Sequence, residues 1–217
     1  MKKSLLSIAL TSALLTSAFV STSAAATGIE GLSANVGVVS QYFFRGIAQT
    51  STATASTGVD YENGNFSVGT WAADVEDGLE IDFYGSYANK LDNGFGYSVG
   101  FTSYQYTGGF DTQYNEVNLG ASYEFLSVAY SIGKHEEGSI DNDYHFLSIT
   151  AEYNGFYATY GTWDDDTKVL DGDYIELGFG TDVSGFDIGV ALIANSKELN
   201  GGIENDESLV FSIGKSF

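Results

Sequence analysis

The chain has 217 residues, with 8 Lys and Arg against 29 Asp and Glu, and its formal net charge of −21 excludes nucleic acid as an expected partner. It contains no Pro and no Cys, so no disulfide is expected, and it holds 27 Gly, 15 Tyr and 15 Phe. With a mean hydropathy of −0.03, this composition favours many β-strands over a helical membrane protein.

The N-terminal segment has the three-part layout of a secretory signal peptide: Lys2 and Lys3, an apolar stretch from Leu5 to Val20, then Ala24 to Ala26. Serine and threonine residues interrupt the apolar stretch, which argues against a membrane-spanning helix. We expect cleavage after Ala26, which leaves one domain over residues 27–217. The cleaved segment carries two Lys and no acids, so the formal charge falls from −21 to −23.

The remaining chain divides into segments of about ten residues in which apolar and polar positions alternate, separated by clusters of Gly, Asn, Asp and Ser. This pattern predicts twelve strands. They are Leu32–Phe44, Ala53–Tyr61, Phe66–Asp74, Glu80–Ala88, Phe95–Tyr106, Tyr114–Phe125, Ser127–His135, Asp143–Tyr153, Phe156–Thr162, Asp173–Thr181, Phe186–Asn195 and Ser208–Phe217.

The connections alternate in length. Residues 62–65, 154–155 and 182–185 make tight turns, and Asn154-Gly155 is a strong two-residue hairpin signal. Residues 135–142, 163–172 and 196–207 are long and carry many acids. Short and long turns on opposite rims are typical of outer-membrane barrels, although a soluble β-sandwich shares the same alternation.

The last segment, Ser208 to Phe217, places Leu209, Phe211, Ile213 and Phe217 on one face. A terminal Phe on such a strand resembles the C-terminal signal of bacterial outer-membrane β-barrels, whose last strand pairs with the first. We therefore predict an all-β fold, a transmembrane antiparallel up-and-down β-barrel of about twelve strands. The resemblance implies outer-membrane lipid and the barrel-assembly machinery as partners, and the bacterial outer membrane as the location.

A family resemblance rests on several motifs. These are Ser40-Gln41-Tyr42-Phe43-Phe44-Arg45-Gly46-Ile47-Ala48-Gln49, Gly58-Val59-Asp60-Tyr61, Gly69-Thr70-Trp71-Ala72, Glu80-Ile81-Asp82-Phe83-Tyr84 and the terminal Ser212 to Phe217. Together they resemble the TorF-type porins, a family of small proteobacterial outer-membrane proteins, over nearly all of residues 27–217. The resemblance implies a barrel and a pore, and it brings no established substrate or catalytic residue.

Strand parity assigns the faces of this barrel, because lipid tolerates apolar side chains and charges must turn inward. Tyr42 is assigned to the lipid-facing aromatic girdle, whereas Arg45 ends the first strand on the lumen face, within reach of several acids. The candidate pore-lining residues are Arg45, Asp60, Glu80, Asp82, Glu116, Glu152, Glu176 and Asp187.

This acidic lumen predicts a narrow diffusion channel for small polar solutes with a bias toward cations. The alternative is a structural or adhesive barrel whose lumen is plugged by its own side chains. Inward tyrosines are expected to pack within the lumen or to contact sugars and cations.

Catalysis is not expected, because His135 lies at the rim and His145 faces outward, so the two histidines do not converge. The acids at 164–166, 171 and 173 offer oxygen ligands for Ca²⁺, but Lys168 breaks the usual calcium-loop pattern. We therefore expect no cofactor and no metal.

Overall fold

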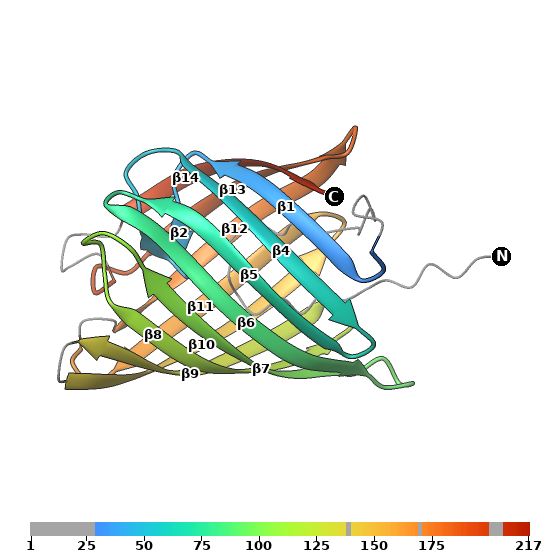
Figure 1. The fold of residues 1–217 in the computed structure, drawn as a ribbon, viewed down its shortest axis with the longest axis horizontal. Helices are drawn as coiled ribbons and strands as arrows, with labels where there is room; N and C mark the ends of the chain where they lie inside the picture. Colours follow the sequence, from blue (N-terminus) through green and yellow to red (C-terminus); the bar gives the residue numbers. More distant parts are fainter. Residues whose placement is uncertain (1–28, 138–139, 169–170, 200–205) are drawn as a thin grey trace.

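A closed barrel of twelve antiparallel strands forms the protein, as the computed structural model shows for residues 29–137, 140–168, 171–199 and 206–217 (Figure 1). The fold prediction is confirmed, whereas the signal-peptide prediction lies outside the described residues. The barrel strands are β1 (Leu32–Val39), β4 (Thr54–Asn63), β5 (Phe66–Val75), β6 (Gly78–Lys90), β7 (Gly96–Tyr106), β8 (Gln113–Tyr123), β9 (Leu126–Glu137), β10 (Ile140–Tyr153), β11 (Phe156–Asp165), β12 (Gly172–Val183), β13 (Phe186–Asn195) and β14 (Asp206–Ser216).

Each barrel strand pairs with its neighbours in the chain, and β1 closes the barrel by pairing with β14 on one side and β4 on the other. Beyond the seam ladder, Ala34 and Phe217 exchange two backbone hydrogen bonds. The predicted pairing of the last strand with the first is therefore confirmed. Among the described residues, no helix has the length and apolar character needed to cross a membrane.

The tight turns lie at the end of the barrel that also carries the C-terminus, here called the terminus end; the opposite end is the loop end (Figure 1). Asn154 and Gly155 both have positive φ, 51° and 81°, as a type I′ turn requires. Ser184 and Gly185 repeat this pattern with φ of 58° and 81°. The predicted hairpin at Asn154-Gly155 is confirmed.

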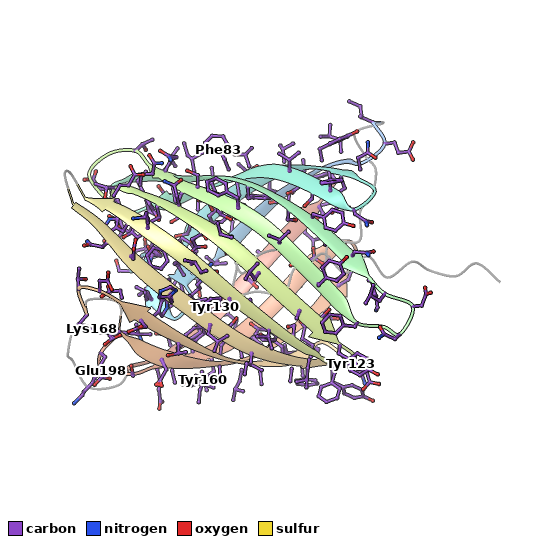
Figure 2. The ribbon with its side chains drawn as sticks, turned by 90° about the horizontal axis from the view of Figure 1, so that it is seen from below. Phe83, Tyr123, Tyr130, Tyr160, Lys168 and Glu198 are labelled. Atoms are coloured by element: carbon purple, nitrogen blue, oxygen red, sulfur yellow. The ribbon has the colours of Figure 1, made fainter. Side chains whose placement is uncertain are left out.

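Side chains alternate between the two faces of every barrel strand. On β8, Val117 and Leu119 are 45% and 43% exposed, while Glu116 and Asn118, which alternate with them, point inward and are buried. Around the barrel the apolar outer side chains form a continuous belt, in which Phe83, Tyr123 and Tyr160 point away from the wall (Figure 2). An exposed apolar surface of this extent is the lipid-facing belt of a transmembrane barrel.

Three predicted boundaries are wrong. The first strand ends at Val39, not Phe44. The predicted long loop over 135–142 is mostly ladder, since β9 and β10 continue to pair through His135 and Asn142. Likewise β11 extends to Asp165, beyond the predicted end at Thr162. Charged and polar residues at these rims obscured strand pairing, because a strand beyond the lipid needs no apolar face.

Residues 40–53 fold back into the barrel and are called the inward hairpin. Its two short strands are β2 (Phe43–Phe44) and β3 (Ile47–Ala48), which pair only with each other. Arg45 and Gly46 form the tip with φ of 48° and 84°, the positive values that a two-residue hairpin turn requires. Gly46 suits this position because its backbone lies against the ring of Tyr174, where a Cβ atom would approach within 2.5 Å.

The lipid-facing assignment of Tyr42 is consequently wrong. Tyr42 lies at the start of the inward hairpin and is only 2% exposed, packed against Trp71 inside the barrel. Its backbone is fixed by the return strand of the hairpin, since Gln49 N donates to Tyr42 O and Tyr42 N donates to Thr50 Oγ1. Strand parity failed here because the chain leaves the barrel wall three residues earlier.

Candidate functional site in the barrel lumen

The centre of the lumen holds a buried ion pair between Arg45 at the hairpin tip and Glu116 on β8. Arg45 Nη1 donates to Glu116 Oε1 at 2.7 Å, and Arg45 Nη2 donates to Glu116 Oε2 at 2.9 Å. This is a two-pronged contact, which a guanidinium makes with a carboxylate and an ammonium group does not. Both side chains are at most 2% exposed, so solvent screens the pair very little.

Two tyrosines complete the surroundings of the Glu116 carboxylate. Tyr104 OH on β7 donates to Oε2 at 2.9 Å, and Tyr144 OH on β10 donates to Oε1 at 2.9 Å. Each carboxylate oxygen therefore accepts one bond from the guanidinium and one from a phenol. With this set of donors the carboxylate is held in one orientation, which makes Glu116 a preorganised receptor for a planar cation.

Aromatic rings enclose the guanidinium. Its Cζ atom lies 4.4 Å from the centroid of Phe146, 4.8 Å from Phe44 and 5.4 Å from Trp163, distances at which the ring faces attract a cation. Because these rings also exclude water, the attraction is stronger than it would be at a surface.

The backbone of the hairpin tip is fixed by side chains from distant strands. Trp163 Nε1 on β11 donates to Arg45 O at 3.0 Å, and Asn195 Nδ2 on β13 donates to Gly46 O at 3.1 Å. These bonds satisfy the buried carbonyl oxygens of the two tip residues. The hairpin is therefore docked by specific contacts as well as by hydrophobic packing.

Two further acids lie beside this ion pair. On β6, Glu80 accepts a 2.8 Å hydrogen bond from Tyr42 OH, and Asp82 is fully buried. Among the described residues, Glu80 Oε2 and both carboxylate oxygens of Asp82 have no hydrogen-bond partner. Buried carboxyl oxygens without partners are costly, so Glu80 and Asp82 are the groups beside the ion pair that an additional donor would stabilise.

The remaining predicted pore residues are spread along the lumen. Asp60 on β4 accepts a 2.6 Å bond from Tyr84 OH, and Glu176 on β12 is buried and accepts a bond from Tyr157 OH. Asp187 is half-buried near the terminus end, and Glu152 is exposed beside the tight turn after β10. The structure thus brings Arg45, Glu80, Asp82 and Glu116 together and leaves the other four apart; that they line a pore stays a prediction.

The lumen differs between its two ends. Two apolar clusters fill the loop-end half around the inward hairpin, one built on Phe43, Phe146 and Trp163 and the other on Tyr42 and Trp71. Toward the terminus end the inward side chains are small, polar and only half-buried. They include Ser67, Ser86, Ser98, Ser122, Thr150 and Thr159. These side chains are therefore more accessible to solvent than the buried clusters around the hairpin.

The family follows from a comparison of the sequence with protein-family models. A model described as "Bacterial protein of unknown function (Gcw_chp)" matches residues 23–217. The chain belongs to the Gcw_chp family. A search of curated proteins finds no match. The Gcw_chp match does not test the resemblance to TorF-type porins.

Solved structures similar to this Gcw_chp protein are barrels of very different sequence. One comes from a study of in-meso crystallization of membrane proteins, with a TM-score of 0.60 at 10% identity over 86% of this chain and 83% of that one. It supports the fold alone. The outer membrane protein opdK from Pseudomonas aeruginosa has a TM-score of 0.41 at 12% identity, covering 87% and 67%. OccAB3 of Acinetobacter baumannii gives 0.41 at 12%, covering 88% and 66%.

The histidines of this Gcw_chp protein lie apart. His135 stacks on Tyr114 at the loop end and contacts Asp111 and Thr112, whereas His145 stacks on Tyr130 on the outer face.

Among the acids considered as Ca²⁺ ligands, the ammonium group of Lys168 lies 2.7 Å from Asp164 and 3.4 Å from Asp171. Within the described ranges no group of three or more His, Cys, Asp and Glu is arranged to hold a metal ion.

Sequence reasoning identified the acids and Arg45 but missed the residues that hold the arginine in place. Trp163 was assigned to a loop, Tyr42 to the lipid face, and Asn195 to the end of a strand without a role. The signal that could have found them is the run Phe43-Phe44-Arg45-Gly46-Ile47-Ala48, in which two turn-forming positions separate two apolar pairs.

Proposed function

We propose that this protein is an outer-membrane channel, exported by its N-terminal segment and inserted by the barrel-assembly machinery, that passes small polar solutes and prefers cations. The TorF-type resemblance supports a pore. The apolar outer belt fits lipid, and the half-buried polar side chains at the terminus end fit a water-filled entrance.

One observation carries the proposed cation preference: the distribution of charge across the barrel wall. Of the six Lys and Arg residues that follow position 26, all described, only Arg45 is buried. Four of the others lie on the outer face or in connections, and Lys90 is exposed at the end of β6. The inward acids Glu80, Asp82, Glu116 and Glu176 therefore share the barrel interior with a single buried base. A confined passage with this excess of carboxylates concentrates cations and repels anions.

Single-channel recording in planar bilayers across a KCl gradient tests the proposal. The reversal potential should indicate K⁺ preference at about 0.1 M salt, where the screening length is about 10 Å, and weaker preference at about 1 M, where it is about 3 Å. An anion-selective current would contradict the proposed role of the inward acids.

A second candidate, a structural barrel that conducts nothing, is favoured by the burial of the inward hairpin. Tyr42, Phe43, Arg45 and the rings around them leave almost no exposed surface in the loop-end half of the lumen. The two candidates differ in what happens when the hairpin is displaced, for example in Gly46→Ala. A channel should then conduct in discrete steps, whereas a structural barrel should remain silent in both native and variant forms.

A further inference from the structure

We propose that the Glu116 site is a binding site for small solutes that carry a guanidinium group, and that Arg45 occupies it as a built-in competitor. This site would name the class of solute that the proposed channel passes, and its role in transport rests on that proposed function. The assignment depends on the chemistry around Arg45, on the buried carboxyl oxygens without partners beside it and on the way the hairpin is held.

The chemistry of the site matches a guanidinium group specifically. Glu116 presents both oxygens to two guanidinium nitrogens, at 2.7 and 2.9 Å, while Tyr104 and Tyr144 hold the carboxylate in that orientation. Phe146 and Trp163 supply ring faces from the barrel wall at 4.4 and 5.4 Å. These wall groups remain in place when the hairpin leaves. They are suited to any ligand that ends in the same planar cation.

A second, independent observation is the pair of unsatisfied acids beside this site. Both oxygens of the fully buried Asp82 and one oxygen of Glu80 have no hydrogen-bond partner among the described residues. Arg45 thus pairs with only one of three neighbouring acidic side chains, Glu116. Glu80 and Asp82 would be paired by a ligand with further donors or a second positive group, such as the α-amino group of free arginine.

The hairpin is held in a way that permits exchange. Its own ladder consists of two residue pairs, and its tip places the non-glycine residue Arg45 at a positive φ of 48°, a conformation that is unfavourable for a residue with a Cβ atom. Most of its stability comes from side-chain contacts with the wall. A solute that takes over the contacts made by the Arg45 guanidinium removes the most specific of them, so ligand binding and hairpin docking are mutually exclusive at Glu116.

The chain offers a local reporter for this exchange. Its two tryptophans, Trp71 and Trp163, both lie in the apolar clusters around the hairpin. Their fluorescence can therefore be followed in detergent-refolded barrels during titration with L-arginine. L-citrulline, which replaces the guanidinium by a neutral urea group of the same shape, serves as the matched control ligand.

Arginine should bind Arg45→Ala at least about 10-fold more tightly than the native barrel, because a competing state that is about 90% or more populated weakens apparent affinity by that factor. In the Arg45→Ala background, Glu116→Gln should abolish the gain, whereas Glu176→Gln, which changes a buried lumen acid bonded to Tyr157, should keep it. Citrulline should leave the fluorescence unchanged.

The inference is overturned if Arg45→Ala binds arginine no more tightly than the native barrel, if citrulline acts like arginine, or if Glu116→Gln has no effect. Heat-shifted mobility on a gel verifies that each variant is folded. If Arg45→Ala does not fold, Arg45→Lys replaces it, since lysine keeps the charge without the two-pronged contact. Arg45→Lys should show a smaller gain in arginine affinity than that expected for Arg45→Ala, and no gain in affinity overturns the proposal. Fluorescence does not depend on current, so arginine binding without conductance refutes only the channel, and conductance without binding refutes only this site.

Discussion

Gly46→Ala should release the inward hairpin. A methyl group at this position would lie 2.5–2.7 Å from carbon atoms of Tyr174, closer than real Cβ contacts, and φ is 84°. The left-handed conformation costs an alanine about 1–2 kcal/mol, and crowding in a packed interior adds about 1–3 kcal/mol. The docked state therefore loses about 2–5 kcal/mol. Since 1.4 kcal/mol corresponds to a factor of ten, the displaced population should rise at least about 25-fold.

Trypsin provides the assay, because the Arg45–Gly46 bond is a cleavage site that is buried in the docked hairpin. Gly46→Ala barrels in lipid vesicles should be cut after Arg45 at least about 25-fold faster than native barrels if cleavage follows the displaced population. Gly185→Ala is the matched control, since Gly185 has a nearly equal φ of 81° but a methyl group there would meet nothing within 4 Å. Equal cleavage of native and Gly46→Ala barrels, both folded, would refute the docking argument.

Three other changes test separate contacts. Asp82→Asn removes an ionisable carboxyl group that is buried without a hydrogen-bond partner and should raise the temperature at which the barrel loses its heat-shifted gel mobility; a lower temperature would show that the carboxyl group is stabilised in its site. Trp163→Phe keeps a ring but leaves the carbonyl of Arg45 without this donor, at a cost of about 1–3 kcal/mol, so tryptic cleavage after Arg45 should accelerate; an unchanged rate would contradict this role. The Glu76 carboxylate accepts a 2.6 Å bond from Ser51 N–H, which lowers its pKa. This bond stabilises the folded state fully above the ordinary pKa of a glutamate, about 4.5, and its contribution is lost as the pH falls through the lowered pKa of Glu76. Acidification should therefore increase hairpin opening, measured as current, in native barrels but not in Glu76→Ala barrels.

The barrel itself was predictable because its physical cause is repeated along the chain. The strands from Phe66–Val75 to Asp206–Ser216 alternate exposed apolar residues with inward residues that are mostly polar or small, so the same pattern is repeated from one strand to the next. The glycine of Asn154-Gly155 marked a turn through the conformation that it permits. Both signals are local, and lipid enforces them at every strand.

The inward hairpin was not predictable in the same way. Tyr42 and Phe43 have the same aromatic character as lipid-facing residues, and their burial depends on partners more than 25 positions away, such as Glu80. The pairing of Arg45 with an acid followed from charge balance inside a narrow lumen. Its choice of Glu116 depends on the depth to which residues 40–53 descend, which strand parity does not encode.

The contacts of the hairpin tip set an order of events during folding. Trp163 and Asn195 bond the tip across 118 and 149 positions of sequence, and Ser40, where the chain leaves β1, bonds Phe211 on β14. All three partners belong to the last four strands of the barrel. The first loop to be synthesised is therefore among the last to dock, and a half-assembled barrel has an unobstructed lumen. Truncation of the chain before β11 would remove the means of closing it.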